Sequence, residues 1–421
     1  MSTLTSQSQS LNDWLCFIEQ SHPIEKIELG LARVQQVAER GQLHQLPGQV
    51  ILLAGTNGKG TTARTLELML EAQGKTVGVY TSPHLLKFNE RLRIAGVDVS
   101  DALWVQGLTQ VQQLRQDIPL TYFEFTTLAA FAVLKAQKPD ICIIEVGLGG
   151  RLDATNIVTP DVSVITTIDL DHQDWLGPDR ESIGREKAGI FRPQTPVVIG
   201  DLMAPLSVSE MAAQLKCPTL RVNQDYGYQQ SASSWRWQCG EVVLQDLIIP
   251  QVPVQNVATA FACLSLLHLL PTAATANQVL RQLQLAGRMQ WLSRQPAVLL
   301  DVAHNPQSAH YLSNQLQLLH GKYRQIHLIA GMLKDKDIQQ ALQPFVGHNY
   351  QWHLLSLPGA RGAHASQLQA ALPSCEAVVQ IEDLNVLQRT MHQAATDELW
   401  VVFGSFVTVA EFLQQWTQDE K

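Results

Sequence analysis

The segment Gly55-Thr-Asn-Gly-Lys-Gly-Thr61 decides the fold, because it joins an apolar run at residues 50–54 to a helical pattern at residues 61–73. A buried strand, a glycine-rich turn and a helix in this order form the context of a phosphate-binding loop. The glycines let consecutive backbone N–H groups turn towards phosphate oxygens, and the start of the helix adds partial positive charge. We therefore predict that a nucleotide contacts Gly55, Thr56, Asn57, Gly58, Lys59, Gly60 and Thr61.

Lys59 is expected to reach the β- and γ-phosphates, and Thr61 or Thr62 to offer a hydroxyl to a metal ion. The spelling departs from the general G-x-x-x-x-G-K-[ST] form, since only two residues separate Gly55 from Gly58, and Gly60 follows the lysine. This departure limits the classes of ATPase to which the loop can belong. The alternative, a glycine-rich turn without a ligand, is the less favoured interpretation.

Outward from this loop, short apolar runs alternate with amphipathic stretches. That pattern predicts an α/β fold with a mostly parallel sheet covered on both faces. Residues 202–254 break the pattern and indicate irregular β structure, and a second alternation starts at Pro296. We predict a phosphate-loop ATPase domain over residues 1–290 and a smaller Rossmann-like α/β domain over residues 296–421.

Composition excludes several classes of protein. With 421 residues, 45% of them hydrophobic, the chain can bury a large core, and its formal charge of −8 gives no electrostatic case for nucleic acid or an anionic membrane. No apolar run approaches the roughly 18 residues of a membrane span. Residues 1–10 form a Ser/Thr/Gln tract that we expect to be a frayed tail and not a signal peptide. The six cysteines form no C-x-x-C pair, which fits a reducing cytoplasm.

We expect a monomer, because no coiled coil or repeat is evident.

Polar side chains follow several predicted strands, at the edge where open α/β sheets bind ligands. Glu145 ends an apolar run, His172 follows the next one, and Ser82 follows an earlier one. A lone carboxylate at such a place needs a cation or a partner, and magnesium is the natural candidate beside a phosphate loop. The alternatives are a capping or salt-bridged carboxylate for Glu145, turn chemistry for Ser82 and a solvated helix face for Lys187. For His172 alone, a role without a metal is about as well supported as a role with one.

Together, several stretches resemble the folylpolyglutamate synthase family, which belongs with the Mur-type amide ligases. They run through nearly the whole chain in the family's order. The stretches are the phosphate loop, Thr81-Ser-Pro-His84, Tyr122-Phe-Glu-Phe125, Glu145-Val-Gly-Leu-Gly-Gly-Arg-Leu-Asp-Ala-Thr-Asn156, Leu170-Asp-His172, Glu186-Lys-Ala-Gly-Ile190, Asp301-Val-Ala-His-Asn-Pro306, Gly331-Met-Leu-Lys-Asp-Lys-Asp337 and Gly404-Ser-Phe406. The resemblance is greatest to the bacterial bifunctional members, which are dihydrofolate synthases as well.

This resemblance implies a reaction. A carboxylate of dihydropteroate, or of the glutamate tail of a reduced folate, attacks the γ-phosphate of ATP to form an acyl phosphate. The amine of L-glutamate then displaces phosphate. ATP is thus a co-substrate, Mg²⁺ occupies two sites, and the family pattern leaves room for a monovalent cation.

The resemblance also implies roles for individual residues. Magnesium would be held by Ser82, Glu145, His172 and a carbamylated Lys187. ATP would be contacted by the phosphate loop, Asn256, Arg288 and Asp301, and catalysis would involve Lys59, Glu145, His172, Lys187, Asp301, His304 and Ser405. The pterin would lie against Ile27, Glu28, Leu29, Gly30, Thr121, Tyr122, Phe123, Glu124, Leu152, Asp153 and Ala154.

Simpler interpretations stand beside these roles. Phe123 suits a core, Asp301 an N-cap, His304 a turn and Ser405 a cap of the last helix. Two other functions are also open: a cell-wall Mur ligase, against which Gly60 counts because those enzymes place Ser or Thr after the lysine, and a nucleotide-binding regulator without catalysis. The retained set Glu145, His172, Lys187, Asp301 and His304 speaks against the regulator.

Overall fold

A computed structural model describes residues 10–23, 27–374, 376–381 and 383–419, so the tail expected at residues 1–10 falls almost wholly outside the described residues. The chain divides into two compact units. The first contains the described residues up to Ile168 together with Trp175–Leu283. The second contains Asp169–Asp174 and the described residues from Gln284 onward. The segment that carries His172 therefore groups with the second unit, although it lies within the stretch of sequence expected to form the first domain.

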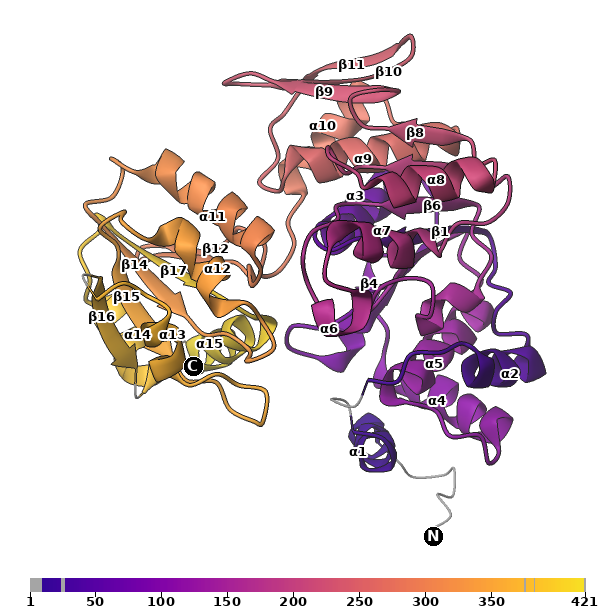
Figure 1. Cartoon of the computed structure of the whole chain (residues 1–421), viewed down its shortest axis with the longest axis horizontal. Coiled ribbons are helices and arrows are strands. Elements are labelled where there is room, and N and C mark those ends of the chain that lie inside the picture. Colours follow the sequence, from indigo (N-terminus) through magenta and orange to yellow (C-terminus); the bar gives the residue numbers. More distant parts are fainter. Residues whose placement is uncertain (1–9, 24–26, 375, 382, 420–421) are drawn as a thin grey trace. The chain divides into compact units, whose positions relative to one another are not determined.

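The first unit is built on an eight-stranded sheet in the order β4-β3-β2-β5-β1-β6-β7-β8. All neighbouring pairs are parallel except β2 with β3 and β3 with β4. Four strands of this sheet, β1, β4, β6 and β8, are labelled in Figure 1. The strands are β1 (Gln49–Ala54), β2 (Val77–Tyr80), β3 (Leu92–Ile94), β4 (Val97–Asp98), β5 (Ile141–Glu145), β6 (Val162–Ile165), β7 (Val197–Ile199) and β8 (Thr219–Arg221).

Helices cover both faces of this sheet. Alternate residues of a strand point to opposite faces, and in β1 the side chains of Val50 and Leu52 join one core while Ile51 and Leu53 join the other. The helices are α1 (Leu11–Ser21), α2 (Ala32–Gly41), α3 (Lys59–Glu71), α4 (Asp101–Arg115), α5 (Tyr122–Gln137), α6 (Gln173–Leu176), α7 (Arg180–Ala188), α8 (Leu206–Gln214), α9 (Val254–Leu266) and α10 (Ala273–Gln282). Burial on both faces explains why β1 and β5 read as continuous apolar runs.

The part expected to be irregular is an antiparallel three-stranded sheet, β9 (Tyr226–Gln230), β10 (Trp235–Cys239) and β11 (Val242–Leu247). Its regularity comes from two tryptophans. Trp235 stacks on Phe261 of α9 at 5.7 Å between ring centroids, and Trp237 meets the same ring edge-on at 5.9 Å. Alternate residues of β10 thus face the core, with a register shift between the two tryptophans.

The second unit has its own six-stranded sheet, ordered β12-β13-β17-β14-β15-β16, in which only β12 is antiparallel to its neighbour. Its strands are β12 (Gln290–Arg294), β13 (Ala297–Leu300), β14 (Gln325–Ala330), β15 (Gln351–Leu355), β16 (Ala377–Ile381) and β17 (Glu398–Phe403). Its helices are α11 (Pro306–Leu319), α12 (Ile338–Leu342), α13 (Ala365–Ala370), α14 (Leu384–His392) and α15 (Phe406–Asp419). The predicted fold class, an α/β protein with a large mostly parallel sheet and a second α/β domain, is confirmed. No helix in the described ranges is long and apolar enough to cross a membrane.

A pair of histidines lies on neighbouring strands of the second sheet. His327 Nδ1 is 3.0 Å from His353 Nε2, and the His327 ring stacks on Trp400 at 3.8 Å. Burial lowers the pKa of each imidazole to about 4; the charge of Arg324 lowers the pKa of His327 further, and repulsion from His327 lowers the pKa of His353 further when both rings would be protonated. Both rings are therefore neutral near pH 7.

This pair predicts an acid-sensitive second unit. Because the folded pKa of about 4 lies below the ordinary histidine value of 6.5, the unfolded chain takes up protons first as the pH falls. The two histidines therefore remove stability as the pH drops from 6.5 towards 4, and no more below that window. The urea midpoint, followed by tryptophan fluorescence, should fall across this range. The double variant His327→Phe/His353→Phe should flatten the fall, whereas His310→Gln, at an exposed histidine of α11, should leave it as in the wild type.

Candidate functional site

The predicted phosphate loop lies between β1 and α3, and hydroxyls at the end of β6 hold its backbone. Thr166 and Thr167 donate from Oγ1 to the carbonyl of Asn57, at 2.6 and 3.0 Å. Thr56 N–H donates to the carbonyl of Thr167 at 2.6 Å. With the Asn57 carbonyl held by these hydroxyls, the loop keeps a defined path into the first turn of α3.

Close neighbours account for two glycines of the loop. At Gly58, where φ is +90°, a Cβ would meet the Oδ1 of Asn256 on α9. At Gly55, where φ is +156°, it would meet the hydroxyl of Thr166. L-residues rarely adopt such φ values. The structure thus brings Asn256, a predicted ATP contact, against the phosphate loop.

Lys59, Ser82 and Glu145 come together at the ends of neighbouring strands. Lys59 Nζ donates to the carbonyl of Gly55 at 2.9 Å and lies 3.9 Å from Oε1 of Glu145. The backbone N–H of Ser82 donates to Oε2 of Glu145 at 3.3 Å. The Glu145 carboxylate, only 6% exposed, therefore faces a cation and an N–H group where β5 ends.

The donors in this group suit magnesium, which prefers carboxylate and hydroxyl oxygens. Glu145 supplies a buried carboxylate, and Ser82 carries a hydroxyl on the residue whose N–H already faces that carboxylate. Within the described ranges, no three His, Cys, Asp or Glu side chains form a cluster that could hold a metal by themselves.

The block that follows Glu145 is held by its own side chains. Asp153, 2% exposed, accepts from the N–H groups of Leu148 and Thr155, each at 2.9 Å. Asn156 donates to the carbonyls of Arg151 and Gly189 at 3.0 and 3.1 Å. Burial raises the pKa of the Asp153 carboxyl. Asp153 thus shapes the loop and leaves its neighbours Leu152 and Ala154 in fixed positions.

The same block packs on α7, which carries Lys187. A Cβ on Gly150 would lie 2.9 Å from the Lys187 carbonyl, and Arg151 N–H donates to the carbonyl of Glu186 at 2.8 Å. Lys187 is 3% exposed. The interpretation of this lysine as part of a solvated helix face is therefore wrong, because the loop after β5 covers it.

The three segments predicted to meet the pterin also lie together in the first unit. Gly30 N–H donates to the carbonyl of Leu152 at 3.4 Å, and Arg33 joins Glu28 to Glu124. Residues 27–30 and Leu152 are half-buried, and Thr121, Tyr122, Glu124 and Ala154 are buried. Phe123 is partly buried and packs against the core of the first unit, and a Cβ added to Gly147 would lie 2.5 Å from its Cζ. Its contact with the pterin stays a prediction.

In the second unit, Asp301 follows β13, and its carboxylate accepts hydrogen bonds from two backbone N–H groups. Its carboxylate accepts from Met289 N–H at 2.9 Å and from Ala303 N–H at 2.8 Å. Burial raises its pKa, and the nearby charge of Arg288 opposes that rise. The N-cap of α11 is Asn305, not Asp301, so the capping interpretation of Asp301 is wrong.

Phe406 brings the remaining predicted residues of this unit together. The Arg288 guanidinium lies 5.2 Å from the centre of its ring, and the His304 ring is 6.5 Å away. Ser405, next in the chain, is 3% exposed and accepts from Thr408 N–H at 3.0 Å. Ser405 therefore does act as a cap in the first turn of α15, as the simpler interpretation held.

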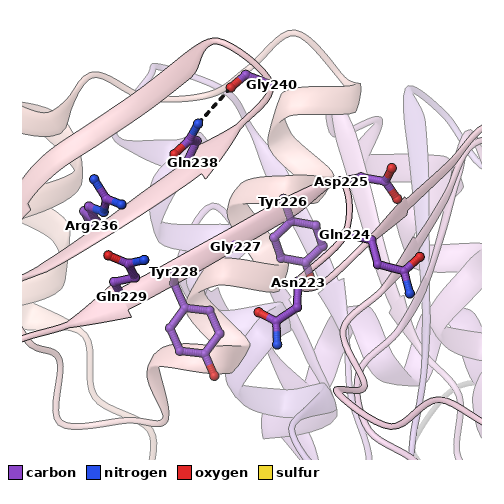
Figure 2. Close-up of a pocket in the computed structure, with 10 residues that line it drawn as sticks. All are labelled: Asn223, Gln224, Asp225, Tyr226, Gly227, Tyr228, Gln229, Arg236, Gln238 and Gly240. Atoms are coloured by element: carbon purple, nitrogen blue, oxygen red, sulfur yellow. Dashed lines mark hydrogen bonds between the residues drawn. The ribbon is translucent and has the colours of Figure 1, made fainter.

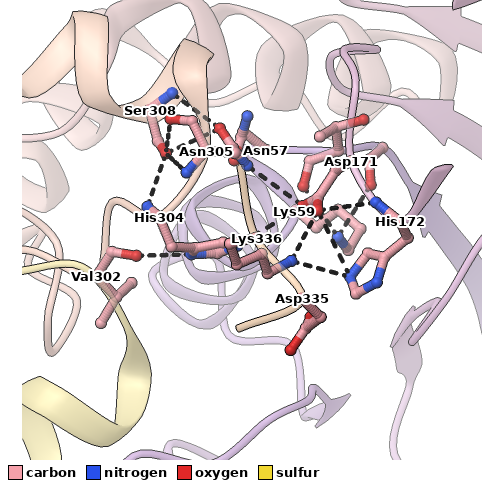
Figure 3. A network of polar contacts seen from close by, with 12 residues as sticks. Asn57, Lys59, Asp171, His172, Val302, His304, Asn305, Ser308, Asp335 and Lys336 are labelled. Carbon is pink, nitrogen blue, oxygen red and sulfur yellow. Dashed lines mark hydrogen bonds and ion pairs between the residues drawn. The ribbon is translucent and has the colours of Figure 1, made fainter. Parts of the chain in front are cut away.

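A charged network surrounds Asp171, whose role the sequence did not indicate (Figure 3). Lys336 Nζ lies 2.7 Å from Oδ1 of Asp171 and 3.3 Å from Nε2 of His172, and His304 Nε2 lies 3.7 Å from Oδ2 of Asp171. Burial alone would raise the pKa of Asp171, but His304 and Lys336 hold it well below its usual range. Burial, followed by the charge of Lys336, lowers the pKa of His172 to about 4. His172 is thus neutral, as a metal ligand must be.

A separate hollow of about 430 Å³ lies over β9 and β10 (Figure 2). Polar side chains such as Asn223, Asp225 and Arg236 line it, and none of the predicted site residues does.

Sequence reasoning missed Arg33, Asp171 and Lys336. All three lie within or beside stretches that carry the resemblance, and Lys336 belongs to the quoted stretch Gly331–Asp337. Their charges were visible, but their partners were not, because those lie 91 and 165 residues away along the chain.

Comparison with known proteins agrees with this geometry. The pattern of the Mur ligase middle domain matches residues 53–246, and that of the Mur ligase glutamate ligase domain matches residues 287–406. A dihydrofolate synthase/folylpolyglutamate synthase from Escherichia coli is 42% identical over 97% of this chain and 96% of its own length. One from Haemophilus influenzae is 39% identical over 96% of each chain.

Solved structures match over the whole length. E. coli FolC in complex with DHPP and ADP has a TM-score of 0.94 at 39% identity, with 100% of both chains covered. The bifunctional folylpolyglutamate synthase/dihydrofolate synthase from Yersinia pestis, complexed with AMPPNP and Mn ion, has a TM-score of 0.90 at 46% identity, with 99% of this chain and 100% of that chain covered. A structure of such a bifunctional enzyme with Mn, AMPPNP and L-glutamate bound has a TM-score of 0.90 at 45% identity and covers the same shares of the two chains.

The crowding at Gly58 predicts how the phosphate loop responds to an added methyl group. Gly58→Ala should weaken ADP binding by about tenfold or more, because the Cβ displaces either the loop or Asn256 and a misplaced backbone loses its N–H contacts to phosphate. Isothermal titration with ADP measures the change. Gly74→Ala is the matched control, since φ is +77° there and no atom lies within 4 Å of the added Cβ. It should cost stability but leave ADP affinity unchanged, and equal effects of the two substitutions would contradict the prediction.

Proposed function

Because the chain belongs to the dihydrofolate synthase/folylpolyglutamate synthase family of Mur ligases, we propose that it uses ATP to join L-glutamate to dihydropteroate and to the glutamate tail of reduced folates. One observation carries this proposal. Lys59 and Glu145 lie 3.9 Å apart beside a phosphate loop, in a chain that matches such enzymes over nearly all of its length. The solved relatives bind ADP or AMPPNP, DHPP, Mn and L-glutamate, which are ligands of the kinds that this reaction requires.

The first step is phosphoryl transfer. The carboxylate oxygen of dihydropteroate or folate forms a bond to the γ-phosphorus, and the bond between that phosphorus and the β,γ-bridging oxygen of ATP breaks to release ADP. The loop N–H groups and Lys59 stabilise the charge that develops on the γ-phosphate. Bound magnesium would add positive charge at the same oxygens, held by Ser82 and Glu145 at one site and by Glu145, His172 and carbamylated Lys187 at a second.

The second step is acyl transfer. The deprotonated amine of L-glutamate attacks the acyl phosphate carbon, the amide bond forms, phosphate leaves with the electrons of the C–O bond, and the nitrogen loses its extra proton. In this proposal His304 and Ser405 act on the incoming glutamate or on the acyl phosphate, while Asn256, Arg288 and Asp301 position ATP. His304 Nδ1 donates to the carbonyl of Val302 at 2.8 Å, and its Nε2 lies 3.7 Å from Oδ2 of Asp171.

The proposal places the pterin against residues 27–30, Thr121–Glu124 and Leu152–Ala154, which meet in the first unit. It also includes a monovalent cation, a monomeric state and a cytoplasmic location. The function as a cell-wall ligase has less support, because Gly60 follows Lys59 and the relatives named above are folate enzymes.

The decisive test compares three acceptors. Purified protein with ATP, Mg²⁺ and L-glutamate should release phosphate and form product with dihydropteroate and also with tetrahydrofolate. A UDP-muramoyl acceptor should give none. Activity with tetrahydrofolate but not with dihydropteroate would contradict the dual function, and silence with every folate would favour the regulator.

Glu145→Gln tests the role of the buried carboxylate. The amide keeps the shape of the side chain and removes its negative charge, so turnover should fall by about a hundredfold or more while the melting temperature changes little. Coupled phosphate release and differential scanning calorimetry measure the two effects. Glu181→Gln is the control, because that carboxylate accepts from Leu206 and Ser207 N–H and serves the structure only. Wild-type turnover in Glu145→Gln would remove this carboxylate from the mechanism.

A further inference from the structure

Arg33, on the first turn of α2, connects two segments of the proposed pterin site. Its Nε donates to both carboxylate oxygens of Glu124, at 2.9 and 2.7 Å. Its Nη1 donates to the Glu28 carboxylate at 3.2 Å, and its Nη2 donates to the Glu28 carbonyl at 2.8 Å. One guanidinium thus contacts both the backbone and the side chain of residue 28, and also a residue 91 positions away.

Glu124 passes this contact on to the start of α5. Its carboxylate also accepts from Thr121 N–H at 2.8 Å, and its own N–H donates to Thr121 Oγ1 at 3.1 Å, which completes a capping box. The carboxylate is therefore fixed by the helix on one side and by Arg33 on the other. Tyr122 and Phe123, which lie between these two residues, take their positions from the same turn.

Gly30 connects residues 27–30 to the third pterin segment, residues 152–154. Its N–H donates to the carbonyl of Leu152 at 3.4 Å, close to the upper limit for a hydrogen bond. Residues 27–30 belong to no helix or strand. The Arg33 contacts to Glu28 are shorter than this one, so Arg33 fixes residues 27–30 against α5 more firmly than Gly30 fixes them against Leu152.

We infer that Arg33 is a positioning residue for the pterin: it holds residues 27–30 in register with the first turn of α5, so that both meet one face of the substrate. The inference rests on the proposed function, because that function assigns these segments to the pterin. Arg33 acts through Glu28 and Glu124 and is not itself a catalytic residue.

A positioning role of Arg33 and a purely structural role predict different effects on pterin use and on stability. The Arg33 side chain is 28% exposed, but the Glu124 side chain is only 4% exposed, so the fold needs a cation beside this carboxylate. A shift of about 1 Å in a substrate contact, in turn, costs on the order of a hundredfold in rate. Replacing the Arg33 guanidinium by another cation should therefore disturb the use of pterin much more than it disturbs the fold.

Arg33→Lys is the main test variant. Lysine keeps the charge, but its ammonium group lacks the planar set of N–H donors with which arginine contacts Glu28 and Glu124 at the same time. In the complete protein, KM for dihydropteroate should rise by about tenfold or more, with KM for ATP and the melting temperature near wild type. Arg33→Ala should show a larger change of the same kind. If that variant does not fold, Arg33→Lys alone decides.

Arg93→Lys is the matched control, because Arg93 also holds a buried glutamate. Its Nε and Nη2 donate to Glu67 at 3.0 and 2.6 Å, and Glu67 is fully buried. This variant should leave the KM for dihydropteroate unchanged, because Glu67 belongs to none of the proposed pterin segments.

The outcomes separate the inference from the function on which it rests. A wild-type KM for dihydropteroate in Arg33→Lys, or an equal rise in KM for ATP, would overturn the positioning role while leaving the proposed function intact. A wild-type protein that ligates glutamate to no pterin acceptor would overturn the proposed function, and this inference with it.

Discussion

The burial of the Glu145 carboxylate is the constraint on which the proposed site of the first unit depends. A charge at the end of a buried strand is costly unless a cation or N–H groups face it. Lys59 supplies the cation at 3.9 Å and Ser82 the N–H at 3.3 Å, and each follows a different strand of the same sheet. Both groups can face one carboxylate because β1, β2 and β5 are parallel and end at the same edge of the sheet. That edge is where a parallel sheet presents its ligand site.

The sequence predicted the parts of this arrangement that depend on local pattern. The apolar runs of β1 and β5, the glycine-rich turn and the polar residues after each strand are all properties of short windows, and the α/β class follows from their alternation. The sequence before α9 indicated β structure but did not indicate that it forms a regular sheet. Its regularity comes from Trp235 and Trp237 packing on Phe261, a residue more than twenty positions away that no local window includes.

What the sequence could not predict are the partners of charged side chains. In the sequence, Arg33 looks like any other polar residue of an amphipathic helix, and only the structure shows Glu124 beside it. Lys187 reads as exposed in the same way, because its helix is rich in charge, and only the packing of Gly150 and Arg151 on α7 shows that it is covered. Lys336 and Asp171 meet across 165 residues. Such pairs are set by the topology of the chain, and their spacing in sequence carries no signal.

The unusual spelling of the phosphate loop has a structural reason of the same kind. The loop is short, with two residues between Gly55 and Gly58, and its path is held by Thr166 and Thr167 after β6 and bounded by Asn256 on α9. A Cβ at Gly55 would strike Thr166, and one at Gly58 would strike Asn256. These two glycines are thus required by neighbouring side chains of this fold as well as by the approach of a phosphate. A loop held in this way from two other elements is already ordered before a ligand arrives, so less ordering entropy opposes binding.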